Sequence, residues 1–491
     1  MMKRYTLLTI VALSVFSILL PTGCGEQTGA SLTSDERPRI FPDYDGVTVP
    51  PNIAPLNFRI EGDVKTASVD IAGDDGQTLR LRAGKHVSIK PGDWRKLLKG
   101  NAGRSLSVRV VTRQADGLTI AWKPFHINIS SDPIDSRLVY RLIEPGYEKW
   151  HIVGIYQRNL ETFEERVIIK NDMMDYNCVN CHSFCNGDPQ QMMFHTRAAY
   201  GGTYIVSAGN IEKLNTLTER TVSNMTYPYW HPSGRYIAAS VNDVKQFFHA
   251  VKERKMEVFD LESDVVVYDV EKQAILSAAS ILTKEAYETF PSFSPDGAWL
   301  YYCSAPALPM PVSYEQIRYA ICRTPFDESQ GRTGALVDTV VPNGEHSASF
   351  PRISPDGRFL MYTETAYGQF PIWHKDAEIR MIDLERGEEI DMSPLNSEDT
   401  DSYHSWGRNS RWVAVSSRRE NGLYTLPYFA HIDESGRPSK PFLLPQKSPD
   451  YYDYLLYSFN IPELVDGEVT VSPYALQHAA VKTTAKQIGF E

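Results

Sequence analysis

Four copies of one short pattern constrain this chain more than any other feature of its sequence. Each copy has an aromatic segment, a turn and an alternating strand-like run: YPYWHPSGRYIAAS, FPSFSPDGAWLYYCS, FPRISPDGRFLMYTE and YHSWGRNSRWVAVSS. Pro fixes φ in the turn and Gly tolerates positive φ, so each copy predicts two strands joined by a tight turn. The aromatics after the turns, Tyr236, Trp299, Phe359 and Trp412, lie 63, 60 and 53 residues apart, which is a blade-sized period.

These repeats predict a β-propeller, because a four-stranded blade cannot bury both faces alone and such units close into a ring. Strand-like segments before and after the four copies extend the prediction to five or six blades over residues 190–485. Residues 41–131 alternate polar and apolar positions between Gly, Asp and Pro, which predicts a small antiparallel β-sandwich. Residues 132–174 are interpreted as a connector, and the chain as a whole is expected to be all-β.

The N-terminus has the layout of an export signal. A basic pair precedes an uncharged apolar run that is too short to span a membrane comfortably, and Cys24 follows it. The ending resembles a bacterial lipobox, which implies that residues 1–23 are removed and that Cys24 carries lipid; an ordinary secretory peptide cut elsewhere is the alternative. Residues 24–40 are small and polar and are expected to be a tether. We therefore expect a cell-envelope protein on the periplasmic face of the outer membrane, attached by its lipid alone.

The segment 175–197 contains Cys178-Val179-Asn180-Cys181-His182, a CxxCH motif at the predicted seam between the two β domains. Two thiols at this spacing can each form a thioether to one edge of a porphyrin, and the adjacent His182 can supply the proximal imidazole. The motif predicts one covalent haem c, with His195 as a possible distal ligand. A Cys₃His zinc knot that includes Cys185 and a Cys178–Cys181 disulfide are the alternatives.

The repeats resemble those of TolB-type β-propellers, which are commonly six-bladed. With the CVNCH motif and the lipobox-like start, the chain resembles propeller lipoproteins of Bacteroidetes-type bacteria that are loosely labelled cytochrome c biosynthesis proteins. This resemblance implies a haem used for electron transfer or redox sensing, with the propeller as docking platform. The expected partner is a periplasmic or envelope redox protein, or an unknown ligand of the propeller channel.

Several further residues are candidates for a structural or functional role. Cys303 and Cys322 end successive predicted strands and are interpreted as a possible disulfide or as two buried thiols. Cys185 is then left as a free thiol. His231 stands where other copies of the repeat have serine. Positions just before the turns, which in propellers often reach the channel, are held by His346, His404, Asp399 and Asp401.

The sequence excludes some functions and leaves three open. The net charge of −11 and the lack of a basic tract argue against nucleic-acid binding. No Ser/His/Asp arrangement, nucleotide-binding loop or paired-carboxylate motif is identifiable, so no catalytic residue is assigned. The remaining functions are an electron-transfer or redox-sensing cytochrome, a haem enzyme acting on a ligand in the channel, and a haem-free scaffold or binding protein.

Overall fold

The computed structural model describes residues 32–144, 151–249, 256–276 and 283–491. The proposed signal peptide and residues 24–31 of the predicted tether, including the lipidation candidate Cys24, lie outside the described residues. The rest of the predicted tether is described and contributes β1 (Leu32–Thr33) to the N-terminal domain. Within those four ranges, no helix has the length and hydropathy that crossing a membrane requires.

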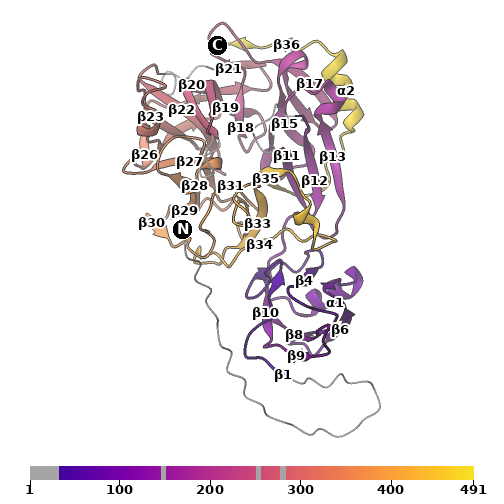
Figure 1. Cartoon of the computed structure of the whole chain (residues 1–491). Helices are drawn as coiled ribbons and strands as arrows, with labels where there is room; N and C mark the ends of the chain where they lie inside the picture. Colours follow the sequence, from indigo (N-terminus) through magenta and orange to yellow (C-terminus); the bar gives the residue numbers. More distant parts are fainter. Residues whose placement is uncertain (1–31, 145–150, 250–255, 277–282) are drawn as a thin grey trace, which may run out of the picture.

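The N-terminal domain consists of two β-sheets and one helix (Figure 1). Its strands are β1 (Leu32–Thr33), β2 (Ile40–Phe41), β3 (Thr48–Val49), β4 (Phe58–Ile60), β5 (Thr66–Gly73), β6 (Thr78–Ala83), β7 (His86–Val87), β8 (Ser105–Arg113), β9 (Thr119–Ala121) and β10 (Phe125–Ile129). The larger sheet has the order β1-β9-β8-β10-β3, with β5 pairing β8 and β6 pairing β5; the smaller sheet is β2-β4-β7. The alternating region 41–131 thus forms a β domain, as expected.

One helix completes this domain. Helix α1 (Pro91–Gly100) begins with proline, which suits the first helical position because its missing N–H would have no intrahelical partner. Its buried residues Trp94, Leu97 and Leu98 are spaced i, i+3, i+4 and therefore share one face, directed into the core. The Trp94 indole donates a hydrogen bond of 3.1 Å to the Ile53 carbonyl, which fixes the helix on the loop before β4.

Six four- or five-stranded sheets form the rest of the protein. Blade 1 has β14 (Val179–Phe184), β15 (Gln191–Thr196), β16 (Gly202–Ser207) and β17 (Asn210–Asn215); blade 2 has β18 (Thr226–Trp230), β19 (Tyr236–Phe248), β20 (Met256–Asp269) and β21 (Ala274–Leu276). Blade 3 has β22 (Ala286–Phe293), β23 (Trp299–Pro306), β24 (Ala320–Asp327), β25 (Arg332–Thr333) and β26 (Asp338–Val341). Blade 4 has β27 (Ser347–Ile353), β28 (Phe359–Thr365), β29 (Glu378–Asp383) and β30 (Glu388–Ile390); blade 5 has β31 (Asp401–Trp406), β32 (Trp412–Ser417), β33 (Leu426–His431) and β34 (Phe442–Leu443).

The sixth blade joins the two ends of the propeller. Its innermost strand is β35 (Ser458–Val465), which pairs with β11 (Arg137–Ile143), and β12 (Val153–Asn159) and β13 (Glu165–Lys170) follow outward. The innermost strands contact one another in the order β14, β18, β22, β27, β31, β35 and back to β14, so the ring is closed. The interpretation of residues 132–174 as a connector is therefore wrong: this segment supplies three strands of a blade whose fourth strand comes from the other end.

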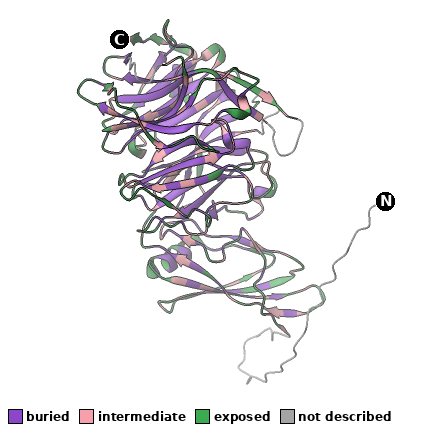
Figure 2. Cartoon of the chain, turned by 90° about the vertical axis from the view of Figure 1, so that its left-hand side faces the viewer, coloured by how far each residue is buried: buried purple, intermediate pink, exposed green. Residues whose placement is uncertain are grey.

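The N-terminal domain is packed firmly against the propeller. A single hydrophobic core includes Tyr44 and Val47 of the domain together with Trp412 and Phe442 of blade 5. Asn57, which is buried, donates hydrogen bonds to the carbonyls of the 446–447 segment at 3.3 and 3.0 Å. Figure 2 shows the buried strands concentrated in the propeller, with exposed residues along the edges of the N-terminal domain.

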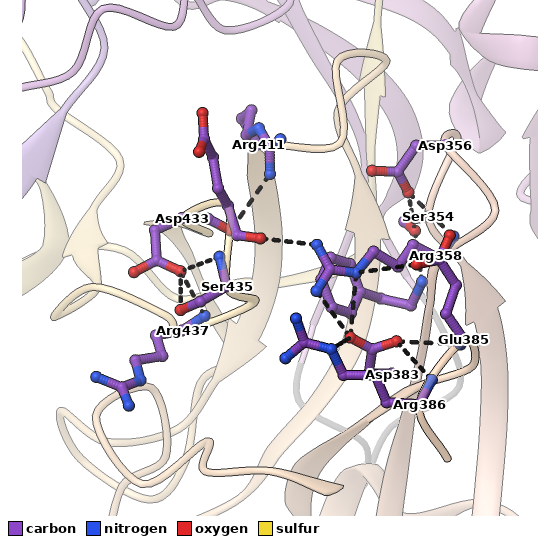
Figure 3. A network of polar contacts seen from close by, with 12 residues as sticks. Ser354, Asp356, Arg358, Asp383, Glu385, Arg386, Arg411, Asp433, Ser435 and Arg437 are labelled. Atoms are coloured by element: carbon purple, nitrogen blue, oxygen red, sulfur yellow. Dashed lines mark hydrogen bonds and ion pairs between the residues drawn. The ribbon is translucent and has the colours of Figure 1, made fainter. Parts of the chain in front are cut away.

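The turn after the inner strand is held by the polar residues of the repeat (Figure 3). In blade 4, the Ser354 hydroxyl donates to Asp356 at 2.5 Å and accepts the Phe359 N–H at 2.9 Å. Arg358 then forms an ion pair of 2.8 Å with Asp383 on β29, whose side chain is fully buried. Blade 2 repeats this pairing, since Arg235 and Asp269 occupy the corresponding positions at 2.9 Å. The arginine after the turn therefore ties the second strand of a blade to the third.

The C-terminal tail covers the outer edges of three blades. After β35, helix α2 (Pro473–Lys482) packs against β13 and β17; β36 (Lys486–Gln487) and β37 (Gly489–Phe490) then pair in parallel with β17 and β21. Strand edges left open invite pairing with other chains, so covering them protects blades 6, 1 and 2. Figure 1 shows the C-terminus at the end of the molecule farthest from the N-terminal domain.

Candidate functional site in the propeller channel

The CxxCH segment is the inner strand of blade 1. Every inner strand has a register shift at one place, where two residues face one residue of the neighbouring strand. In blade 1 the shift lies between Asn180 and Ser183, so Cys181 and His182 form the bulge. The bulge pairs of blades 2, 3, 4 and 6 are Tyr227-Pro228, Phe290-Pro291, Phe350-Pro351 and Ile461-Pro462. In blade 5 the bulge pair is Ser402-Tyr403, and His404 is back in the ladder opposite Val415. Residues 181–184, Cys-His-Ser-Phe, are thus a fifth copy of the segment that reads Tyr-His-Ser-Trp in blade 5.

The bulge residues close the channel with a ring of aromatic side chains. The ring centroids of Tyr227 and Phe290 lie 4.3 Å apart, those of Phe290 and Phe350 lie 4.6 Å apart, and those of Phe350 and Tyr403 lie 4.5 Å apart. Cys181 takes the place in this ring that aromatics hold in four other blades. Positive φ is unusual for non-glycine residues, yet Cys181 has a φ of 55°, close to the 48° of Phe290. Its backbone conformation therefore follows from the blade geometry.

A cavity of about 330 Å³ lies next to the ring, at the ends of the inner strands. Cavity-lining residues come from one repeat position in five blades, two residues after Cys181, Tyr227, Phe350, Tyr403 and Ile461: Ser183, Tyr229, Arg352, Ser405 and Glu463. The walls also include Trp230, Phe293 and Trp406, one from each of three blades. The indole N–H of Trp230 donates to the Ser183 carbonyl and that of Trp406 to the Arg352 carbonyl, each at 3.2 Å. The cavity thus combines aromatic walls with a few polar groups, as small-molecule sites do.

Arg352 and Glu463 are the two ionisable groups that the sequence interpretation missed. Each side chain is half-buried, because it borders the cavity on one side and protein atoms surround it on the others. This burial raises the pKa of Glu463 to about 8. One Glu463 oxygen accepts the Phe184 N–H at 2.8 Å. The sequence signal is a charged residue at the repeat position where other copies have Ser or Tyr, as in Phe-Pro-Arg beside Phe-Pro-Ser.

His182 and His404, which hold the same position in the repeat sequence, differ in their surroundings. His404 Nδ1 lies 3.0 Å from the Ser402 carbonyl and Nε2 lies 3.3 Å from the Met361 carbonyl. Neither nitrogen of His182 makes a hydrogen bond of normal geometry, although the backbone of Ile461 and Val139 lies close enough to favour the protonated ring. Burial, assisted by the positive charge of Arg141, lowers the pKa of His182 to about 3, so the ring is neutral.

The residues of the CxxCH motif do not fit a covalent haem in this fold. Of the three, only His182 lines the cavity, and both of its nitrogens are buried rather than open to it. Cys178 and Cys181 are only 6% and 2% exposed, and neither lines the cavity. Thioether attachment requires both thiols at one edge of a porphyrin with the imidazole beneath the iron. Haem attachment stays a prediction that this arrangement does not support.

The other predicted ligands also lie apart. His195 on β15 approaches Thr203 at 3.3 Å and does not border the cavity that His182 lines; burial lowers its pKa to about 3. Among the described residues, no group of three or more His, Cys, Asp or Glu side chains is arranged to hold a metal ion, so the Cys₃His alternative finds no support. Cys185 is buried, 3.7 Å from the His231 carbonyl.

Of the two interpretations of Cys303 and Cys322, the structure has the two buried thiols and not the disulfide, since both cysteines are free. The register places Cys303 opposite Ile321 and Cys322 opposite Tyr302, so the two side chains point to opposite faces of blade 3. They belong to two different core clusters.

The remaining candidate residues have structural partners or lie elsewhere. His231 Nδ1 lies 2.7 Å from the Ser233 hydroxyl and Nε2 3.2 Å from the Gly297 carbonyl, so it braces two turns. Asp401 forms an ion pair of 2.8 Å with Arg419. His346 is exposed, and Asp399 accepts the Thr400 N–H at 2.8 Å within its own loop. Of the residues predicted to reach the channel, only His404 lines the cavity.

The fold and its closed ring of inner strands define an all-β protein with a six-bladed propeller and an N-terminal β domain. No protein-family model matches the chain, and no curated protein matches it. Solved structures to which the chain is similar include a periplasmic gluconolactonase of Pseudomonas aeruginosa, at 12% identity over 62% of this chain and 68% of that chain, with a TM-score of 0.28. A putative 6-phosphogluconolactonase of Bacteroides uniformis matches at 12% identity over 78% of this chain and 98% of that chain, with a TM-score of 0.33. A Mycobacterium tuberculosis puromycin-hydrolyzing peptidase matches at 13% identity over 70% of this chain, which spans about half of that protein (52%, TM-score 0.36).

Proposed function

We propose that this protein binds a small molecule in the cavity of its propeller channel. The observation that carries the proposal is the pair Arg352 and Glu463, which face a cavity of about 330 Å³ deep in the propeller with few protein partners. Polar and charged groups in the interior are costly unless they are paired or hydrogen-bonded. A site that keeps such groups beside aromatic walls suits a ligand that supplies the missing contacts.

The haem-free binding protein is thus the predicted function that the site favours. Electron transfer needs a cofactor that the CxxCH segment does not present in this fold, and no described residue supplies a second route to one. The lipid anchor and the envelope location stay predictions from the N-terminal sequence. They are compatible with a receptor-like role, because an exported binding protein meets solutes outside the cytoplasm.

A screen against a blocked variant tests the proposal. Small uncharged, cationic and anionic compounds are screened by thermal shift and confirmed by calorimetry on the wild type and on Ser405→Phe, which places a ring in the cavity. Ser329→Phe, on an exposed turn of blade 3, is the matched control. One-to-one binding that is lost in Ser405→Phe and kept in Ser329→Phe supports the proposal. A screen without hits, or hits that bind a folded Ser405→Phe equally well, refutes it.

A further inference from the structure

The guanidinium of Arg352 has few hydrogen-bond partners for a group that lies inside the propeller. One amino group, Nη1, donates to the Pro351 carbonyl at 2.9 Å, and the guanidinium lies over the Tyr229 ring at 4.9 Å from its centroid. In the described part of the chain, no carboxylate lies within ion-pair distance of it. Because arginine carries five N–H donors and stays charged, several donors have no protein acceptor.

The surroundings of Arg352 favour a negative partner. Glu463 is the one acidic side chain among the cavity-lining residues described, and burial raises its pKa to about 8, so at neutral pH it is mostly an uncharged donor. Arg141 is a second buried guanidinium near the channel; it donates to the Asn180 amide oxygen and its Nε has no partner. Arg408, at the cavity, is already neutralised by Asp466. The histidines His182 and His404 are neutral, since burial lowers their pKa values to about 3 and 4.

Part of the cavity wall is aromatic. Trp230 and Trp406 donate their indole N–H groups to backbone carbonyls, so they contribute ring carbon atoms to the lining. Phe293 adds a third aromatic side chain. A ligand for this cavity therefore needs one charged end and one apolar body.

Resting on the proposed function, we propose that the ligand is a small organic monocarboxylate, with its carboxylate against Arg352 and Glu463 and its apolar body among the three aromatic side chains. The planar fork of arginine matches the two oxygens of a carboxylate, and a protonated Glu463 can donate a further hydrogen bond to it. Both side chains are half-buried at the cavity, and hydrogen bonds to a charged group are stronger there than at a fully exposed surface.

Four probes separate the charge of the ligand from its shape: phenylacetate, 2-phenylethanol and phenethylamine are similar in size, and phenylalanine adds an ammonium group beside the carboxylate. Calorimetry at pH 7 on the full chain should rank phenylacetate first, at least about tenfold tighter than the alcohol, which corresponds to about 1.4 kcal/mol. Arg352→Gln should bring the acid within about threefold of the alcohol while the alcohol still binds. Arg352→Lys, which keeps the charge without the fork, should keep part of the preference.

A control variant and two contrary results separate the carboxylate inference from the broader proposal that the cavity binds a small molecule. Arg380→Gln, which removes a blade 4 arginine paired with Glu364 away from the cavity, should leave all four affinities unchanged. Alcohol or amine binding as tightly as phenylacetate overturns the carboxylate inference and leaves cavity binding intact. Tight binding of phenylalanine supports the carboxylate contact, because phenylalanine carries the same group. Failure of all four probes also overturns it, while the broader screen against Ser405→Phe judges the cavity itself.

Discussion

Replacing His182 by proline tests whether the CxxCH segment is an inner strand of the propeller. Four of the six inner strands already have proline at the equivalent bulge position: Pro228, Pro291, Pro351 and Pro462. In each of these strands the preceding residue has a positive φ between 48° and 55°, and Cys181, which precedes His182, has a φ of 55°. The backbone around residue 182 is thus shaped as it is around the four prolines.

Two effects of opposite sign determine the size of the change. The smaller proline ring leaves a void of a few tens of Å³, which costs about 1 kcal/mol at roughly 24 cal/mol per Å³. Removing an imidazole whose nitrogens are buried without hydrogen bonds of normal geometry returns about 1–3 kcal/mol. We expect the free energy of unfolding to change by less than about 1.5 kcal/mol, which shifts Tm by only a few degrees.

Thermal unfolding followed by circular dichroism measures this change beside a matched variant. Ser183, one residue along, is paired with Met193 in the ladder, so Ser183→Pro removes a sheet hydrogen bond and adds a ring clash. Together these should cost at least about 3 kcal/mol. If His182→Pro unfolds the protein as readily as Ser183→Pro, the bulge equivalence is wrong and the motif has a different structural role.

Three further outcomes can be checked. Arg358→Ala should lower the free energy of unfolding by about 3 kcal/mol because it removes the closest ion-pair partner of the buried Asp383 and leaves only Arg386, 3.8 Å away and mostly exposed. Arg386→Ala, at the exposed side of the same carboxylate, should cost under about 1 kcal/mol in a denaturant titration. Protein produced with a c-type maturation system should show no covalent haem after acid-acetone extraction; a stoichiometric haem band would contradict the fit described above. Burial raises the pKa of Glu463 in the folded state, so the folded protein binds more protons at this group than the unfolded chain, and the free energy of unfolding falls as pH rises from about 4.5 to about 8. Glu463→Gln should flatten this fall of Tm with pH in melting curves. An unchanged dependence of Tm on pH would show that the carboxyl group is not buried as described.

The propeller itself was predictable because its signals are local. The turns with Pro and Gly and the alternating strands after them depend on neighbouring residues alone, and their period implies a ring. The first blade was harder to see, since Cys181 and His182 replace the aromatic and the proline of the repeat. The Ser183-Phe184 pair and its likeness to Ser405-Trp406 were the available signal.

The blade that closes the ring could not be predicted in the same way. Strand β35 pairs with β11, which lies more than 300 residues earlier in the chain, and nothing in the residues of either strand indicates which strand it pairs with. The segment 132–174 therefore reads as a connector until the pairing is known. The same limit applies to Cys303 and Cys322, because a register that alternates faces decides whether two cysteines on adjacent strands can meet.

The sequence by itself determined the fold class, the turns and the repeat, because these depend on backbone preferences and on the period of apolar residues. Only the tertiary structure decided what the distinctive residues do. On an open segment the two thiols and the imidazole of a CxxCH motif can turn toward one haem. On a buried inner strand the bulge and the neighbouring blades fix the direction of each side chain instead. Arg352 and Glu463, unremarkable in sequence, become a site because ring closure brings β27 and β35 to one cavity and removes water from their charges.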